Sequence, residues 1–333
     1  MLTCCCNLIY RLTVAALFFC GFVFTLDKVF AADKLTGLHS AQVMSQSMPW
    51  IAQEAGLFKK YDLDFRLVFI PSSPVATAAT LNGDAEIGVT GAIGNVRAYV
   101  QGFTDLVFIG GIKNILTHSI LGKPEIKRPE DLRGKKVGVG RFGGNTHYFT
   151  IQALKRFGMD ASKDIQTIQT GGGPETVAAL LSGSVDAAGL VAPGDSAVAA
   201  RGFRYVINGP ELRIPYGAAQ FVTLRSVIAK RGAVMGRFMR VMAESAKILY
   251  TDKNFVYKVL GKYLRITDTK VLDAAYQSEI PALERRLEIH DAALQSSLDE
   301  IAPTDPRAKA IKPQELIDRR YLVELDKSGV FDK

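Results

Sequence analysis

A glycine-rich turn followed by polar side chains is the stretch of this sequence whose residue types could best do chemistry. It reads GRFGGNTHYFTIQAL, residues 140 to 154, and VGV precedes it. Gly138, Gly140 and Gly143 satisfy the G-x-G-x-x-G spacing of dinucleotide sites, in which backbone N–H groups at a helix start hold a pyrophosphate. Two interpretations compete: a nucleotide cradle, or a site for another group that binds N–H donors.

The nucleotide interpretation fails where the motif is specific. A dinucleotide site has an acidic residue at the tip of the next strand, but that strand ends here in Gln169-Thr170. We therefore favour a site in which Gly143 and Gly144 let the backbone approach a ligand, while the helix beginning near Asn145 presents its first N–H groups. Such donors suit a small anionic or strongly dipolar group.

Polar and aromatic side chains around this turn extend the candidate site. Asn145 and Thr146 would add hydrogen bonds to a ligand, although Asn145 is equally suited to capping the helix. His147, on the first turn of the helix, either contacts the ligand or packs inside the fold. Phe142 and Tyr216 are expected to form an aromatic wall.

Other candidate residues suggest binding and not catalysis. No G-x-S-x-G elbow surrounds Ser45, Ser47 or Thr90, so we expect these hydroxyls to hydrogen-bond a solute. Trp50 either stacks on the ligand or staples its helix to the sheet, and Asp195 either binds a cationic group or caps the following helix. The four histidines lack metal-ligand spacing, so the sequence predicts no metal site and no catalytic residue.

An internal repeat predicts the elements that position these residues. SPVATAATLNGDAEIGV, residues 73 to 89, matches GPETVAALLSGSVDAAG, residues 173 to 189, at an offset of 100 positions. Proline at the start and glycine past the end are typical of a short helix, and an apolar strand follows each. With the strands and helices upstream, each half becomes strand, helix, strand, helix, strand. We expect parallel pairing in two α/β lobes, at about residues 36–110 and 125–215.

The expected sheets point to particular loops, because ligands of open parallel sheets lie beyond the carboxyl ends of the strands. These loops are Ser45–Met48, Pro71–Ser73 and Thr90–Ala92 in the first lobe, and Arg141–Thr146, Gly171–Gly173 and Ala192–Asp195 in the second. Two similar lobes facing each other make a cleft. From Val227 the pattern turns helical, with one helix expected to begin at the N-cap Asp252 and a last helical run expected near residues 313–325. The strand at residues 219–226 predicts that this tail packs on the first lobe.

Composition and charge favour a globular protein that does not bind nucleic acid. The chain has 333 residues, 48% hydrophobic and 22% charged, enough for two cores. Its formal charge is +8, but lysine and arginine are scattered among acids without a basic stripe. The surface is therefore expected to be an ordinary solvated one.

The first 31 residues are predicted to be a signal peptide. Arg11 precedes an apolar run from Leu12 to Leu26, too short to span a bilayer, and cleavage is expected near Ala31. The segment carries one net positive charge and all four cysteines, so the mature chain would have a charge of +7 and no thiol. Export to the periplasm follows from this interpretation.

Several blocks in order make the chain similar to a known family. The blocks that carry the resemblance are PWIAQEAGLFKKYDLDFRLVFI, LNGDAEIGVTG, RPEDLRGKKVGVGRFGGNTHY, LLSGSVDAAGL and DRRYLVELDKSGVFDK. The chain resembles the periplasmic solute-binding proteins of ABC importers, in the nitrate/sulfonate/taurine group. The resemblance implies an α/β, type II periplasmic binding protein-like fold, with two lobes, a central cleft and hinge strands. Lobe 1 would comprise residues 32–120 plus 220–333, and lobe 2 residues 121–219.

The resemblance also implies a function and a set of ligand contacts. It indicates a monomer that captures a small solute and delivers it to an ABC permease in the inner membrane, without a cofactor. By position, the contacts fall on Ser45, Gln46, Thr90, Gly91, Asn145, Thr146 and the loop with Pro193 and Asp195. The family's G-S-S-A-H-Y turn appears here as GGNTHY. The first-lobe loops contain no acid and are rich in hydroxyls and amides, which favours a neutral polar or anionic small organic molecule over a cationic amine. The expected aromatic wall would suit a pyrimidine-like or aromatic sulfonate ligand.

Two other functions remain to be separated from this one. An enzyme of pyrimidine synthesis for thiamine, on the same fold, would need a reactive histidine or pyridoxal phosphate and would work in the cytoplasm. The sensory lobes of a transcription regulator would need a helix-turn-helix domain ahead of Leu35, where there is no room for one.

Overall fold

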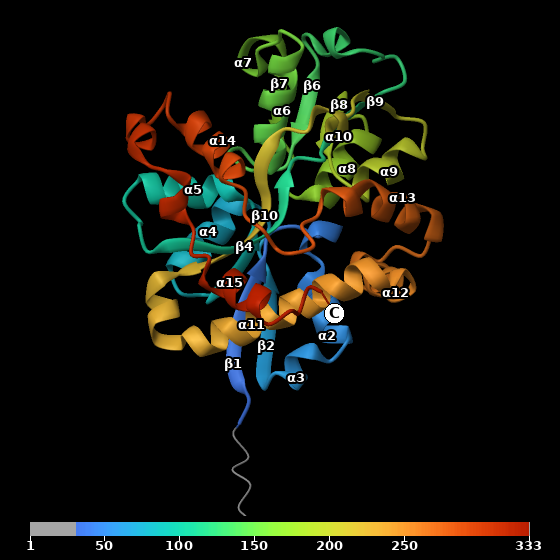
Figure 1. Cartoon of the computed structure of the whole chain (residues 1–333). Coiled ribbons are helices and arrows are strands. Elements are labelled where there is room, and N and C mark those ends of the chain that lie inside the picture. Colours follow the sequence, from blue (N-terminus) through green and yellow to red (C-terminus); the bar gives the residue numbers. More distant parts are fainter. Residues whose placement is uncertain (1–30, 333) are drawn as a thin grey trace, which may run out of the picture. The chain divides into compact units, whose positions relative to one another are not determined.

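Two five-stranded β-sheets organise the computed structural model, which describes residues 31–332 (Figure 1). The signal peptide predicted for residues 1–31 lies, but for its last residue, outside the described residues. From Asp33 onward the described chain clusters into one unit. Within residues 31–332, no helix combines the length and the hydrophobicity that crossing a membrane would require.

The first sheet has the strand order β2-β1-β3-β10-β4. Its strands are β1 (Asp33–His39), β2 (Leu63–Phe69), β3 (Ile87–Thr90), β4 (Leu106–Ile115) and β10 (Pro215–Leu224). β1 pairs in parallel with β2 and β3, whereas β10 is antiparallel to both β3 and β4. Every residue of β3 is buried, as expected for a short apolar strand covered on both faces.

The second sheet repeats this arrangement, with the order β7-β6-β8-β5-β9. Its strands are β5 (Ser119–Gly122), β6 (Lys136–Val139), β7 (Gln166–Gln169), β8 (Ala187–Leu190) and β9 (Arg204–Ile207). β6 is parallel to β7 and β8, and β5 is antiparallel to β8 and β9. The expectation of parallel pairing was therefore incomplete. Each sheet also contains one antiparallel strand, β10 beside β3 in the first sheet and β5 beside β8 in the second.

The helices of the two halves follow the predicted repeat. Those of the first half are η1 (Met44–Gln46), α2 (Met48–Glu54), α3 (Leu57–Lys60), α4 (Ser73–Leu81) and α5 (Ala92–Val100). Those of the second are η2 (Pro129–Leu132), α6 (Asn145–Arg156), α7 (Ala161–Asp164), α8 (Gly173–Leu181), α9 (Gly194–Ala199) and α10 (Gly209–Leu212). α4 and α8 lie 100 positions apart, both have a proline as their second residue, and both are followed by a glycine at positive φ, Gly83 at 80° and Gly183 at 77°.

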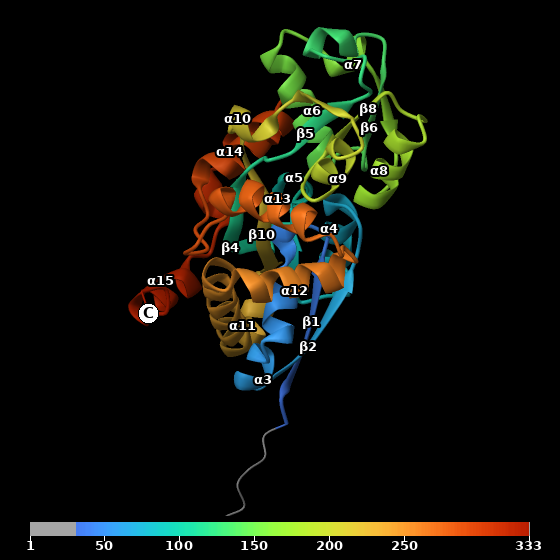
Figure 2. The same cartoon turned by 90° about the vertical axis from the view of Figure 1, so that its right-hand side faces the viewer.

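The C-terminal region is helical, as predicted, and packs mainly on the first sheet (Figure 2). It comprises α11 (Arg225–Thr251), α12 (Lys253–Leu264), α13 (Thr269–Glu279), η3 (Ile280–Ala282), α14 (Asp291–Ile301), η4 (Pro306–Ala310), η5 (Pro313–Leu316) and α15 (Arg320–Lys327). α11 contacts α2, α3 and β10, and α14 contacts β10 and α5. α13 differs, since it contacts both η1 and α9 and so touches helices that follow strands of both sheets.

Two details of this region differ from the sequence-based expectation. α14 was not predicted at all. The helical pattern near residues 313–325 is split into η5 and α15, because Ile317 forms a bridge with Phe108 of β4 and Asp318 N donates to Phe108 O at 2.9 Å. Pairing with the sheet edge thus replaces the helical hydrogen bonds at this point.

The chain passes between the sheets twice, at neighbouring places. Leu116–His118 leads from β4 to β5, and Asn208–Ile214 leads from β9 to β10. Leu116 N donates to Ile214 O at 3.0 Å, so the two connections are paired. Two adjacent connections are a suitable hinge, because a few residues can absorb the rotation of one lobe against the other.

Candidate ligand-binding site

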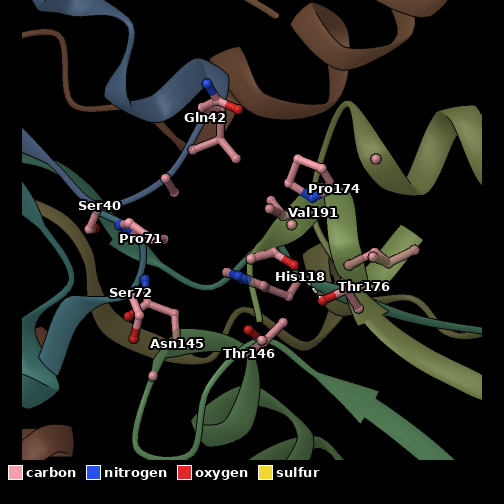
Figure 3. A pocket seen from close by; sticks show the side chains of 18 of the residues that line it. Ser40, Gln42, Pro71, Ser72, His118, Asn145, Thr146, Pro174, Thr176 and Val191 are labelled. Atoms are coloured by element: carbon pink, nitrogen blue, oxygen red, sulfur yellow. Dashed lines mark hydrogen bonds between the residues drawn. The ribbon is translucent and has the colours of Figure 1, made fainter. Parts of the chain in front are cut away.

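A cavity of about 400 Å³ lies where the carboxyl ends of the strands of the two sheets meet (Figure 3). From the first sheet, its wall is made by the segments after β1 and β2, and from the second by those after β6, β7 and β8. The wall is completed by Lys113 of β4, His118 of the first connection, Ala218 of β10, and Leu264 and Ile266 of the C-terminal region. Both sheets therefore supply the wall, as the rule for open α/β sheets predicts.

The structure brings six of the thirteen predicted site residues to this wall: Ser45, Gln46, Gly144, Asn145, Thr146 and Pro193. Their contact with a solute stays a prediction. The other seven, Ser47, Trp50, Thr90, Gly91, Phe142, His147 and Asp195, are not part of the wall. The structure gives each of these seven another environment.

Trp50, Ser47 and Thr90 lie in the protein interior. The Trp50 indole stacks on Tyr263 of α12 with ring centroids 5.1 Å apart, so it staples α2 to the tail. Ser47 and Thr90 are fully buried and neither hydroxyl has a hydrogen-bond partner. Sequence position alone could not distinguish these residues from the exposed ends of the same loops.

His147, Phe142 and Tyr216 shape the glycine turn from outside the cavity. Gly143 N donates to His147 Nδ1 at 3.2 Å, and the Phe142 ring packs edge-on against the imidazole at 5.2 Å. Phe142 is 53% exposed and Tyr216 is fully buried, so the predicted aromatic wall is wrong. Among the described phenylalanine, tyrosine and tryptophan residues, Phe69 at the end of β2 is the one that lines the cavity.

Asp195 lies behind the wall, in the first turn of α9. Its Oδ1 accepts hydrogen bonds from Ser196 N at 2.6 Å and Ser196 Oγ at 3.2 Å. Burial raises the pKa of this carboxyl to about 6, and the nearby Glu279 carboxylate adds to the shift. The carboxylate thus lies in the first turn of α9 without capping it, because the N-cap is Pro193 and no side chain caps this helix.

Asn145 joins the two halves across one side of the cavity. Its Oδ1 accepts from Tyr216 OH at 2.8 Å and from Ser73 Oγ at 3.2 Å, and its Nδ2 donates to Ala218 O at 2.9 Å. Gly91 lies so close that an added Cβ would stand 2.0 Å from Asn145 Oδ1. The amide is thus largely engaged by the protein itself, although it borders the cavity.

Gln46 has a similar supporting role after β1. Its Oε1 accepts from Ser40 N at 2.8 Å and Ala41 N at 2.9 Å, while Nε2 donates to Ser40 Oγ at 3.1 Å. These bonds hold the loop from Ser40 to Val43 against the cavity. Gln46 therefore positions the wall, with its amide already satisfied.

Other polar groups of the wall have no protein partner. The hydroxyl of Thr146 forms no hydrogen bond with the described residues, and Ser72 Oγ and His118 Nδ1 are buried without one. Figure 3 shows Ser72, Thr146 and His118 around one region of the cavity. His118 was missed at the sequence level because it lies on the hinge connection, which the loop rule does not cover.

A buried ion pair lies at the base of the cavity. Lys113 Nζ, on β4, is 2.7 Å from Glu279 Oε2 at the end of α13 and 2.9 Å from Thr117 Oγ1. Thr117 also donates to the second oxygen of Glu279. A lysine inside the apolar run of β4 is a signal that the sequence carries, but its partner is more than 160 positions away.

Helix starts add positive potential without local compensation on one side of the cavity. α4 and α6 have no acidic residue in the first turn, and neither start is capped by a side chain. α8 differs, because the Glu175 carboxylate accepts from Gly172 N at 3.0 Å. The first N–H groups of α4 and α6 therefore favour an electronegative group of the ligand near these two helix starts.

A large part of the remaining wall is apolar. Phe69, Leu190, Val191, Leu264 and Ile266 contribute hydrocarbon surface from both sheets and the tail. Among the described residues, no three histidine, aspartate or glutamate side chains are grouped so as to hold a metal ion. The site is suited to a small organic molecule that has a polar end and an apolar body.

Two pseudo-equivalent α/β lobes, two hinge connections and a cavity between them define the class of type II periplasmic binding protein-like folds. A family model described as NMT1/THI5 like matches residues 47–253, and the chain belongs to that family. The nitrate/sulfonate/taurine resemblance found in the sequence is thereby confirmed.

Known relatives agree with this assignment. The taurine-binding periplasmic protein of Escherichia coli K12 is 32% identical over 121 residues, which cover 36% of this chain and 37% of that protein. The alkanesulfonate-binding protein of Xanthomonas axonopodis pv. citri, solved with MOPS bound, has a TM-score of 0.73 at 20% identity, covering 86% of this chain and 98% of the other. The desulfurization enzyme DSZB has a TM-score of 0.67 at 14% identity, covering 89% and 99%. These structural likenesses show the fold.

Proposed function

We propose that this protein is an extracytoplasmic solute-binding protein that captures a small polar or anionic organic molecule between its lobes and delivers it to an ABC transporter permease. The observation that carries the proposal is the cavity of about 400 Å³ whose wall is built from the strand ends of both sheets. A ligand held there contacts both halves at once, so binding favours closure. The binding-protein relatives support the same role.

The location and partners form part of the proposal. A cleaved signal peptide ending near Ala31 would deliver a monomeric protein to the periplasm, where an inner-membrane permease would accept the solute. No nucleic acid and no cofactor take part. Delivery requires that the solute leave the cavity unchanged, which distinguishes this role from an enzyme.

The second candidate function is catalysis on the same fold, which the likeness to the desulfurization enzyme keeps in view. Binding is favoured because no hydrogen bond joins His118 to a hydroxyl of the wall, and the cysteines of the chain all lie within residues 4–20. The pyrimidine-synthesis alternative has less support than the binding function, because the taurine and alkanesulfonate relatives are binding proteins.

Thermal unfolding with a solute panel tests the proposal. Nitrate, sulfonates, pyrimidines and aromatic acids are added singly, and a true solute at 100 times its dissociation constant should stabilise the protein by about 2.7 kcal/mol. Ala197→Trp, which fills the cavity from α9, should abolish the response. Ala200→Trp, on the exposed end of the same helix, should keep it.

Two results would count against solute binding. A response that survives Ala197→Trp would place the binding site elsewhere. A bound solute recovered by mass spectrometry as a converted product would show an enzyme instead.

A further inference from the structure

Two buried polar atoms on the cavity wall have no partner, and they point to a feature of the solute. They are His118 Nδ1 and Ser72 Oγ. His118 is 6% exposed, and neither of its ring nitrogens is hydrogen-bonded to a described residue. An unpaired buried polar group is unfavourable, and a ligand with a complementary group removes that cost.

The His118 ring is held in place by the surrounding fold. It stacks on Phe149 of α6 with centroids 5.7 Å apart, and its own carbonyl oxygen would lie 1.4 Å from a Cβ at Gly209. Only glycine therefore fits at position 209 against the hinge connection. In Figure 3 the imidazole extends into the cavity toward the side where Ser72 and Asn145 lie.

The imidazole is neutral at physiological pH. Burial, with a further contribution from the Lys113 charge, lowers the pKa of His118 to about 3. A neutral imidazole offers one N–H donor and one nitrogen acceptor. It therefore pairs well with a hydroxyl or a carbonyl group.

The charges around the cavity disfavour a cationic group on the solute. The described wall contains Lys113 and Arg141 but no aspartate or glutamate, and Arg141 has no ion pair or side-chain hydrogen bond with the described residues. Three acids that adjoin wall residues are engaged elsewhere: Glu279 by Lys113, Glu175 by Gly172 N, and Asp195 by Ser196. An ammonium group would be desolvated here without a counter-charge.

We propose that the solute is an organic anion that carries an uncharged hydroxyl or carbonyl group on its body, recognised by His118 together with Ser72, and that zwitterions with a free ammonium group are rejected. This inference rests on the proposed function and narrows it. His118 is then the residue that determines specificity, and the head group of the anion is left to Arg141 and the first turns of α4 and α6.

Two matched series of probes test the inference by isothermal titration calorimetry. The sulfonates are propane-1-sulfonate, 3-hydroxypropane-1-sulfonate and 3-aminopropane-1-sulfonate, and the carboxylates are 4-methylbenzoate, 4-hydroxybenzoate and 4-(aminomethyl)benzoate. In at least one series, the hydroxyl member should bind at least tenfold more tightly than the methyl member. The ammonium member of that series should bind at least tenfold more weakly than the methyl member.

Variants of the full chain separate a role in recognition from a role in folding. His118→Phe keeps an aromatic ring on Phe149 and should abolish the hydroxyl preference, with the methyl member bound within threefold of wild type. His118→Gln is the second variant, used if His118→Phe does not fold. It retains a donor and an acceptor, so it should keep part of the preference for the hydroxyl member. His290→Phe, on an exposed residue, is the matched control and should change neither ratio.

The results that would overturn the inference are clear. One is an ammonium member that binds as tightly as the hydroxyl member of its series. Another is a preference for the hydroxyl member that persists in folded His118→Phe. The third is no binding by any member of either series. The proposed function fails separately, through the full solute panel and Ala197→Trp. A solute found there that lacks a hydroxyl or carbonyl group would refute only the present inference.

Discussion

Asp195 shows how a single buried carboxyl group makes the stability of this protein depend on pH. Its pKa is raised to about 6 by burial, against about 3.9 in an unfolded chain. The folded state therefore binds more protons than the unfolded state between about pH 4 and pH 6. The free energy of unfolding falls as the pH rises through this window, and the loss, about 3 kcal/mol at most, is complete above about pH 6.

Replacing Asp195 with asparagine should remove this loss. The amide cannot ionise but can still accept from Ser196 N, so Asp195→Asn should be more stable than wild type by about 1–3 kcal/mol at pH 8 and no more stable at pH 4. Urea denaturation at the two pH values measures the difference. Asp84→Asn, at an exposed position, is the control and should change stability by less than about 0.5 kcal/mol. A gain at pH 4 equal to that at pH 8 would contradict the assignment.

At the scale of elements, the start of α6 is locked against the starts of α4 and α5 and against β10. Asn145 provides three hydrogen bonds across this junction, and Gly91 leaves just enough space for its amide. Since Asn145 belongs to the second half and Ser73 to the first, the junction also connects the lobes. A side chain at position 91 must therefore displace Asn145.

Gly91→Ala is expected to destabilise the protein by about 1–3 kcal/mol, because the new methyl group overpacks the junction. Adding Asn145→Ala should relieve the clash, so the double variant should cost less than the sum of the single ones. Chemical denaturation without solute gives the four values of this cycle. Gly173→Ala, where an added Cβ meets nothing within 4 Å, serves as the control. Additive effects would show that Gly91 and Asn145 do not share a contact.

At the scale of the whole molecule, the paired connections between the sheets are where we expect one sheet to rotate against the other. Lys113 and Glu279 anchor α13 to the hinge strand, and α13 also touches α9 of the other half. A ligand that contacts both halves stabilises the arrangement in which they are close. Solute binding should therefore change the distance between the lobes.

A pair of labels at equivalent positions of the repeat measures this closure. Asn82 and Ser182 are exposed at the ends of α4 and α8 and are replaced with cysteine to carry the labels. The four native cysteines are replaced with serine, so that the chain has no other thiol: Cys4, Cys5, Cys6 and Cys20. Fluorescence energy transfer between labels should change when a solute identified by the panel is added. The same change should be absent in Ala197→Trp. An unchanged signal with bound solute would exclude lobe closure.

Much of the fold was predictable from local chemistry. The repeat at an offset of 100 positions located α4 with α8 and β3 with β8, since proline starts, glycine ends and apolar strands depend on neighbouring residues alone. The Asp252 cap of α12 was evident for the same reason, and its carboxylate accepts from Phe255 N at 3.0 Å. α14 escaped notice although Leu294, Leu298 and Ile301 have helical spacing.

The candidate site was predictable only in part. Asn145, Thr146 and Gln46 reach the cavity wall because strand ends are visible in the sequence. His118 and Lys113 were missed, since their place at the cavity depends on how the hinge strands cross between the sheets. Trp50 and Thr90 were misplaced because burial within a loop depends on what packs over it.

The amino-acid sequence by itself determined the repeated elements, their caps and the loops at the strand ends, because backbone preference and hydrophobic periodicity act over a few residues. Only the tertiary structure decided which antiparallel strand enters each sheet and which polar groups of the described residues remain unpaired at the cavity. Those features arise when segments more than a hundred positions apart pack together, and packing depends on shape and burial that no local pattern records.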